Sequence, residues 1–184
     1  MEDPIQGDAF GVDYGSHLIT IAKQANNQLG IEIVSNAAQK RQTLVCFSFQ
    51  VGNIRLLGDT AVDQLRFDTQ RTFIFPTRLI GASSEQMETE KAFIPNDFNS
   101  ETRLMQMSET EQVCAEQISG AILSKLIIQS SVNTETSLFV FPMPMYYTAQ
   151  ERQAFKDMTQ IAGLKQDNVR IIPETNATTA FYGF

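Results

Sequence analysis

Cysteine, histidine and tryptophan are scarce in this chain, which has two cysteines, one histidine and no tryptophan. Cys46 and Cys114 lie in apolar surroundings and lack the spacing of metal ligands, so we expect buried free thiols. The lone histidine, His17, cannot form a metal site by itself. These scarcities argue against a disulfide scaffold and against a cysteine–histidine metal centre.

Basic charge and long apolar runs are also lacking. Lys and Arg number 14 against 21 Asp and Glu, which gives a net charge of −7 and a pI near 4.7. Such a balance argues against binding to nucleic acids or to anionic membranes. No apolar run approaches the ~20 residues that a membrane-spanning helix needs. Met1–Pro4 is acidic and lacks the basic-then-apolar order of a signal peptide, so we expect a cytoplasmic protein.

The apolar content is sufficient for a packed core. Apolar residues make up 42% of the 184 residues, and thirteen of them are phenylalanine. A chain of this length and composition is expected to fold as one domain or as two small lobes rather than remain disordered.

The most informative stretch is the first turn, Gly11–His17. An apolar run ends on Asp13, Gly15 follows two positions later, and Leu18–Ala22 resumes as a second strand. We expect a tight β-hairpin in which Gly15 permits a positive φ and a close approach of a ligand. Consecutive amides in such a turn can bind anions, which predicts a phosphate site with Asp13 beside the metal of the phosphates. The same pattern is equally typical of an ordinary turn.

Further along, the chain changes from strands to alternating strands and helices. We expect three strands, a mainly β insertion with a helix, and then a β-α-β-α segment. Ser108–Glu111 and Thr148–Glu151 are capping boxes that predict the starts of two helices. Ser137–Phe141 and Val169–Ile172 are predicted to be buried strands, and the polar stretch Ala82–Lys91 is predicted to be a loop.

The strand-helix-strand order predicts parallel pairing with a right-handed crossover. The first strand and the last two would then lie side by side, with their carboxyl ends at one edge of the sheet. Asp13 and Glu174 would both lie at strand ends facing one crevice, where open α/β sheets bind ligands. Each of the two could equally be a solvated carboxylate at the end of a strand.

A set of short motifs runs in order along the chain: Gly11–Ser16, Leu57–Ala61, Arg78–Gly81, Pro144–Tyr147, Gln150–Ala154, Ile161–Leu164, Ile171–Glu174 and Ala180–Gly183. The first resembles the first phosphate loop of the actin-like ATPase superfamily, and the ordered set resembles the heat shock protein 70 family. The chain is similar to a divergent member, of the heat shock protein 110 or ribosome-associated kind. The resemblance covers only the N-terminal lobe of the nucleotide-binding domain.

The resemblance implies an α/β fold, an RNase H-like lobe with a mixed five-stranded sheet and a small inserted α+β subdomain. We expect residues 1–35 and 105–184 to form the core of the lobe and residues 36–104 to form the insertion. The second lobe and the substrate-binding domain of the family are absent from these 184 residues.

The resemblance also implies roles for individual residues. Asp13 would hold Mg²⁺ through water, and Gly15, Ser16 and His17 would occupy the phosphate-binding loop. Glu174 would orient the water that attacks the terminal phosphate, so that Glu174 and Asp13 form the catalytic pair.

A second pair of residues matches the proline and arginine with which the family relays nucleotide state to the substrate domain. That allosteric pair would be Pro144 and Arg152. The implied cofactors are ATP or ADP with Mg²⁺. The implied partners are the second lobe and peptide-binding domain of the same protein, co-chaperones or another heat shock protein 70, and unfolded polypeptide clients.

Three departures from the family pattern bear on catalysis. Thr77 stands where the family has its catalytic lysine, and it cannot offer a point charge to the γ-phosphate. His17 stands where the family has a second hydroxyl, and it is bulkier. Pro173 and Thr175 replace the asparagine and proline that flank the family's glutamate. We therefore expect nucleotide binding rather than hydrolysis.

Two other functions fit parts of the sequence. One is a non-catalytic co-chaperone or nucleotide-exchange module that acts by protein contact. The other is an RNase H-like nuclease, which would need more converging carboxylates and a basic surface. Because half of a crevice leaves its ligand exposed, we expect little or no nucleotide binding by this chain alone. An exposed apolar patch is expected near Ala180, Phe181 and Tyr182.

Overall fold

The structure, a computed structural model, describes residues 7–25, 30–130 and 132–183. Met1–Pro4, on which the signal-peptide argument depends, lies outside these ranges.

The main sheet is mixed and has the strand order β12-β11-β1-β2-β3, with β4 also paired to β2. Both β3 and β4 are antiparallel to β2, β4 near its start and β3 near its end. The predicted mixed five-stranded sheet is thus confirmed, with a two-residue sixth strand beside it. The strands are β1 (Ala9–Tyr14), β2 (Leu18–Gln24), β3 (Ile31–Ile33), β4 (Thr43–Leu44), β11 (Leu138–Met143) and β12 (Val169–Pro173).

Strands β1, β11 and β12 are parallel neighbours, as the strand-helix-strand order predicts. Phe10 pairs with Phe139, and Phe139 pairs in turn with Val169. Side chains alternate along β1, so that Phe10, Val12 and Tyr14 are buried while the residues between them are exposed. The carboxyl ends of these strands therefore meet at one edge of the sheet.

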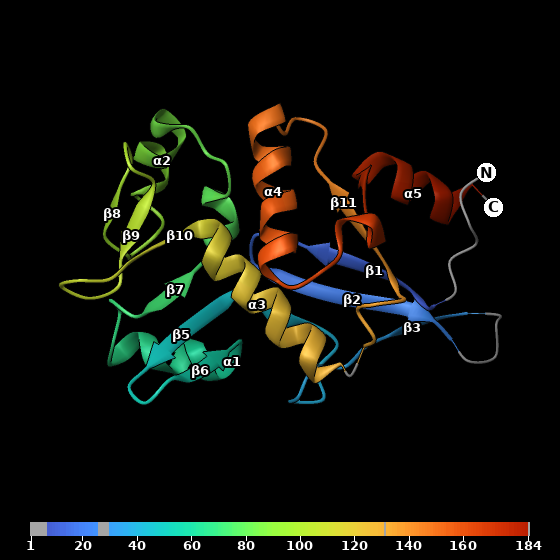
Figure 1. The fold of residues 1–184 in the computed structure, drawn as a ribbon, viewed down its shortest axis with the longest axis horizontal. Helices are drawn as coiled ribbons and strands as arrows, with labels where there is room; N and C mark the ends of the chain where they lie inside the picture. The colour runs from blue at the N-terminus through green and yellow to red at the C-terminus, as the bar shows by residue number, and fades with distance from the viewer. Residues whose placement is uncertain (1–6, 26–29, 131, 184) are drawn as a thin grey trace.

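Two long helices, α3 (Ala115–Gln129) and α4 (Ala149–Ile161), pack against each other in front of the sheet (Figure 1). The capping box predicted at Thr148 is present, since Thr148 and Glu151 exchange side-chain and backbone hydrogen bonds. The short 3-10 helix η3 (Gln166–Asn168) leads into β12, and α5 (Glu174–Tyr182) follows β12 directly.

Two smaller three-stranded sheets lie on the other side of α3, at the left of Figure 1. Their strand orders are β6-β5-β7 and β10-β9-β8. The predicted insertion ends at residue 104, whereas the second of these sheets runs on to Cys114. The strands are β5 (Cys46–Gln50), β6 (Ile54–Leu57), β7 (Thr72–Ile74), β8 (Phe98–Asn99), β9 (Leu104–Gln106) and β10 (Gln112–Cys114).

The short helices of this region are α1 (Asp59–Val62), η1 (Asp63–Arg66), η2 (Pro76–Leu79) and α2 (Ser84–Glu90). The prediction of a loop over Ala82–Lys91 is wrong. Ser83 and Gln86 form a capping box at the start of α2, and Met87 buries the inner face of this helix. Its other side chains are exposed except for the half-buried Glu90, which explains the polar sequence.

The predicted start of the longest helix at Ser108 is also wrong. The Ser108 side chain does accept a hydrogen bond from the Glu111 amide at 3.1 Å. However, this box closes a turn between β9 and β10, and α3 begins only at Ala115. A capping box satisfies the first amides of any turn, so it does not by itself commit the chain to a helix.

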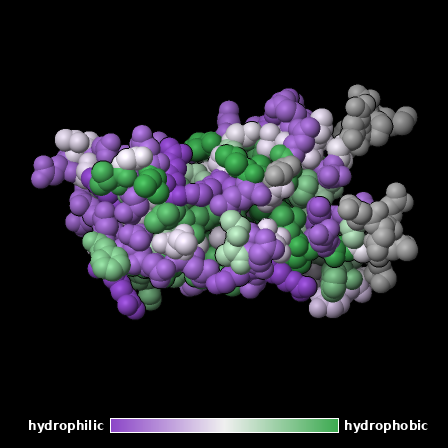
Figure 2. Space-filling model, turned by 90° about the horizontal axis from the view of Figure 1, so that it is seen from below, coloured by the Kyte–Doolittle hydropathy of each residue, from purple (hydrophilic) through white to green (hydrophobic). Residues whose placement is uncertain are grey.

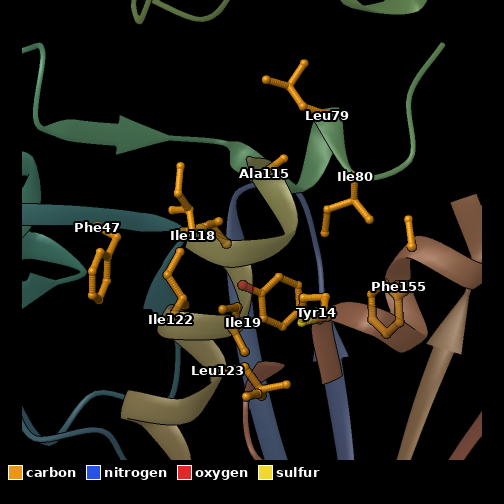
Figure 3. Close-up of a cluster of buried hydrophobic side chains, with 14 of the residues drawn as sticks. Tyr14, Ile19, Phe47, Leu79, Ile80, Ala115, Ile118, Ile122, Leu123 and Phe155 are labelled. Atoms are coloured by element: carbon orange, nitrogen blue, oxygen red, sulfur yellow. The ribbon is translucent and has the colours of Figure 1, made fainter. Parts of the chain in front are cut away.

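The largest hydrophobic core joins the main sheet, the two long helices and the smaller sheets (Figure 3). Ile118, Ile122 and Leu123 of α3 are fully buried between Tyr14 and Ile19 on one side and Phe47 on the other. Both cysteines are free, with Cys46 buried as predicted and Cys114 half-buried. The core therefore fixes the hairpin β1–β2 to the rest of the molecule.

Candidate functional site at the first hairpin

Gly15, Ser16 and His17 form the turn between β1 and β2. Tyr14 pairs with Ile19, and the Gly15 amide donates to the Leu18 carbonyl at 3.1 Å, which closes the turn. The predicted tight hairpin is present, but Gly15 does not have a positive φ. A Cβ at this position would lie 3.0 Å from the Leu18 oxygen, so glycine is required here for space rather than for conformation.

The free amides of the turn are those of Ser16 and His17. Within the described part of the chain, neither amide donates a hydrogen bond to the protein, whereas the Gly15 amide is already used. Two adjacent unpaired N–H groups at an exposed turn are suited to bind an anion. Of the three residues that the resemblance places in the phosphate-binding loop, Ser16 and His17 thus have free amides and Gly15 does not.

Asp13 lies one residue from the end of β1, on the face opposite the buried side chains of Val12 and Tyr14. The residue is exposed, yet partial burial of its carboxyl group raises its pKa above the ordinary value. A carboxylate that has lost part of its hydration gains from a nearby cation. This geometry is compatible with a hydrated Mg²⁺ bound through one carboxylate.

Tyr14 anchors the hairpin to α3. Its hydroxyl donates to the Ser119 carbonyl at 2.9 Å, and its ring packs edge-on against Phe155 at 6.2 Å. Figure 3 shows the hydroxyl directed at α3. Burial raises the pKa of this phenol, so that it remains a neutral donor. The turn is therefore presented on a fixed support rather than on a mobile loop.

A second segment, Phe75–Leu79, lies directly against the turn. The Thr77 hydroxyl donates to the Gly15 carbonyl at 3.2 Å, and the residue is 4% exposed. The rings of Phe75 and His17 lie 4.3 Å apart between centroids. Thr77, which sequence comparison with the family marks only as a missing lysine, thus holds the turn in place. Its partner is 62 positions away, so no local pattern could have indicated the contact.

Glu174 is the first residue of α5 and is exposed. Gly11 of β1 pairs with Val140 of β11. Two residues further along β11, Pro142 pairs with Ile172 of β12. By this register Asp13 lies level with Ile172 across one intervening strand, and Glu174 lies two residues beyond. At ~4.8 Å between strands and ~3.3 Å per residue, the Cα atoms of Asp13 and Glu174 are about 12 Å apart. The two residues therefore lie at the same edge of the sheet.

Arg152 of α4 binds the turn that follows Pro144. Its Nε donates to the Tyr147 carbonyl at 3.0 Å, and its Nη2 donates to the Met145 carbonyl at 3.2 Å. Within the turn, the Tyr147 amide donates to the Pro144 carbonyl at 3.3 Å. The arginine predicted as one half of a relay therefore contacts the segment that contains the other half.

The same turn reaches the start of α5. The Thr175 hydroxyl donates to the Met145 sulfur at 3.4 Å. Burial, with smaller contributions from the charges of Tyr146, Glu151 and Glu174, raises the pKa of Tyr147 to about 12. Contacts thus run from α4, through this turn, to the helix that begins with Glu174.

The described residues contain no group of three or more His, Cys, Asp or Glu side chains that could hold a metal ion by themselves. Over the same residues, no helix has the length and apolar character of a membrane span.

On the face seen in Figure 2, apolar residues form separate patches with polar residues between them.

The apolar patch predicted at the end of the chain is present. Phe181 is 68% exposed and Tyr182 is 79% exposed, and Ala180 beside them is exposed as well. Tyr146 is 81% exposed in the turn that Arg152 binds. Large apolar side chains are thus presented to solvent on both α5 and the turn that contacts it.

Comparisons with known proteins agree with the motifs. The family model described as "Hsp70 protein" matches residues 9–184. The chain is 29% identical over 180 residues to "Heat shock 70 kDa protein 6, chloroplastic" of Arabidopsis thaliana, covering 95% of this chain and 24% of that protein. It is 30% identical over 193 residues to a ribosome-associated molecular chaperone of Saccharomyces cerevisiae, covering 99% of this chain and 30% of that protein.

A third relative, "Chaperone protein dnaK" of Guillardia theta, is 28% identical over 183 residues, covering 96% of this chain and 28% of that protein. The chain thus spans less than a third of the length of these relatives. The family predicted from the ordered motifs is confirmed, and the sheet topology agrees with it. The chain belongs to the heat shock protein 70 family.

Proposed function

We propose that this chain contributes the first phosphate loop of an ATP- and Mg²⁺-binding cleft in a chaperone of the heat shock protein 70 type. One observation carries the proposal: the free amides of Ser16 and His17 follow Asp13 by three and four positions, at the carboxyl end of a strand that is parallel to β11 in the mixed sheet. Phosphate and a hydrated divalent cation are the ligands that such a donor set suits. The rest of the cleft would come from the second lobe.

Each residue of the site has a separate role in this proposal. Asp13 would hold water on Mg²⁺, and the turn would bind the phosphates through the free amides of Ser16 and His17 and the Ser16 hydroxyl. Glu174 orients the attacking water from the end of β12, one strand beyond the neighbour of β1. Bound Mg²⁺ would supply charge neutralisation at the transferred phosphate, while the protein supplies position.

Hydrolysis is expected to be slow. Thr77 is buried, and its hydroxyl already donates a hydrogen bond to the Gly15 carbonyl. It therefore offers neither a charge nor a free donor to a phosphate. Pro144 and Arg152 form the relay between the cleft and the substrate domain, through the Met145–Tyr147 turn. We place the protein in the cytoplasm, with co-chaperones, a second heat shock protein 70 and unfolded polypeptides as its partners, and residues 36–104 as its inserted subdomain.

A second candidate is a non-catalytic co-chaperone or exchange module. The exposed aromatic side chains of Phe181, Tyr182 and Tyr146 favour it, because they offer a surface for protein contact. The two candidates differ in one property, since only the first requires nucleotide to bind at Asp13.

Nucleotide binding is expected to be weak but specific in this chain, and Asp13→Asn should remove it. A half-open site buries little of its ligand, so the dissociation constant of MgATP should be on the order of millimolar. Titration of the ¹⁵N-labelled chain with MgATP should move the amide signals of Ser16 and His17. The neutral amide of the variant keeps the size of the carboxylate but cannot hold the metal.

Asp8→Asn is the matched control, because Asp8 precedes the opposite end of the same strand. It should bind MgATP as the parent chain does. Unmoved signals at Ser16 and His17 up to about 10 mM MgATP would contradict the nucleotide role and leave the protein-contact candidate. A low-micromolar dissociation constant would contradict the half-site.

A further inference from the structure

His17 has an unusual place at the first hairpin, at the centre of the turn and exposed to solvent. Its Nδ1 lies 2.9 Å from the Ser16 hydroxyl, so one side of the ring is occupied by a hydrogen bond. Among the residues that the structure describes, the other ring nitrogen, Nε2, has no partner. The ring therefore keeps one free polar atom beside the free amides of the turn.

The ring of His17 packs against the ring of Phe75, at 4.3 Å between centroids. Phe75 has a φ of 56°, in the left-handed region that a bulky residue rarely adopts. Val45 fixes both residues, because its amide donates to the His17 carbonyl at 2.8 Å and its carbonyl accepts from the Phe75 amide at 3.1 Å. A strained residue that supports an exposed ring suggests a functional constraint on that ring.

The charges around this ring leave the turn without a fixed cation. Asp13 on β1 is negative, and Arg78 on η2 is held by Glu90, whose Oε1 accepts from Nη2 at 2.9 Å. Thr43, Leu44 and Val45 carry no charge. Burial raises the pKa of the neighbouring Cys46 to about 12, so that its thiol stays neutral. In the described part of these elements, His17 is the one side chain at the turn that can carry a positive charge and is not paired with a carboxylate.

We propose that the protonated ring of His17 supplies the positive charge of the phosphate loop, donating Nε2–H to a phosphate oxygen and making nucleotide affinity depend on pH. This inference rests on the proposed function, because it assumes that phosphate binds at the turn. A protonated imidazole donates from both nitrogens, so the Ser16 hydroxyl accepts from Nδ1 while Nε2 stays free for the ligand. The result is a charge-assisted hydrogen bond at the tip of the hairpin.

The direction of the pH dependence follows from the coupling between protonation of His17 and nucleotide binding. A bound polyphosphate stabilises the protonated ring, so the titration midpoint of His17 must be higher in the complex than in the free chain. Binding is then tightest below the midpoint of the free chain and weakens as the pH rises through the midpoint of the complex. A rise of about 0.5 to 1 pH unit corresponds to binding about 3- to 10-fold tighter at the acidic end.

His17 is the only histidine in the sequence, so its ring proton gives a single resolved NMR signal that can be followed from pH 5 to 8. We expect saturating MgATP to raise the midpoint of this signal by that amount. ATP also takes up a proton in this range. The variant His17→Gln, which keeps a polar side chain without the titrating charge, therefore measures the contribution of the ligand alone.

The parent chain should bind MgATP about 3- to 10-fold more tightly at pH 5.5 than at pH 8 after correction by His17→Gln, and His17→Lys should keep tight binding at both pH values. If the amides of Ser16 and His17 respond to MgATP while the midpoint of His17 stays unmoved and the variants bind as the parent does, the inference is overturned and the proposed function stands. If those amides respond at neither pH, the inference and the proposed function are both overturned.

Discussion

Phe141→Ala is expected to lower the free energy of unfolding by about 3–5 kcal/mol. Phe141 is fully buried on β11, the strand between β1 and β12, and its ring packs edge-on against Phe155 of α4 at 5.5 Å. Truncation removes the apolar surface that joins the sheet to α4 and leaves a cavity between them. Because β11 sets the register of Asp13 against Glu174, the substitution acts on the support of the site.

Phe67→Ala is the matched control, since the same change is made where the ring is 83% exposed. It should alter the free energy of unfolding by less than about 0.5 kcal/mol. Urea unfolding followed by circular dichroism measures both variants against the parent chain. Equal midpoints for the two variants would mean that the sheet and α4 are not packed as described.

Gly81→Ala is expected to lower the free energy of unfolding by about 2–4 kcal/mol, from two sources that act together. Gly81 has a φ of 63°, for which a residue with a Cβ costs about 1 kcal/mol. The added Cβ would also lie 2.6 Å from the Glu151 Cα, and forced overpacking typically costs about 1–3 kcal/mol. The nearest atom is backbone inside α4, so it cannot rotate away.

The site of this clash joins the smaller sheets to the two long helices. The Gly81 amide donates to Glu116 Oε1 at 2.9 Å, and Gln150 Nε2 donates to the Gly81 carbonyl at 3.0 Å. The substitution should therefore separate η2 from α3 and α4. Since η2 also carries Thr77, we expect the hairpin turn to lose its anchor.

Gly163→Ala is the matched control that separates the cost of the backbone conformation from the cost of the steric clash. Gly163 has a φ of 90°, and no heavy atom lies within 4 Å of the added Cβ. Only the conformational cost of about 1 kcal/mol should remain. In thermal unfolding the midpoint should fall by about 2–4 °C for Gly163→Ala and by about 4–16 °C for Gly81→Ala. A similar fall in both would show that the close approach of α4 at Gly81 does not matter.

The parts of the fold that could be predicted from the sequence are those with local signals. The apolar run that ends on Asp13 indicated β1, and the Thr148 box indicated the start of α4. Two local signals led to errors for the same reason. The box at Ser108 closes a turn, and the polar stretch after Ala82 is a surface helix with one buried residue, Met87. In both cases tertiary packing decided the outcome.

The site shows the same division. Asp13 and the turn were identified from spacing, but the sequence could not indicate which amides of the turn are free. That depends on the bond between the Gly15 amide and the Leu18 carbonyl. The contacts of Thr77 and Phe75 with the turn join residues about sixty positions apart, and their residue types carry no signal for such pairing.

The location of the metal tests the central claim most directly. Mn²⁺ can replace Mg²⁺ on ATP, and its unpaired electrons broaden the NMR signals of nearby amides. With the ¹⁵N-labelled chain, MnATP should broaden the signals of Asp13–His17 and of residues near Glu174, and Asp13→Asn should lose this broadening. Mn²⁺ without ATP is the control for non-specific binding to a chain of net charge −7. Broadening by MnATP that is unchanged in Asp13→Asn, or that centres away from the first hairpin, would contradict the account.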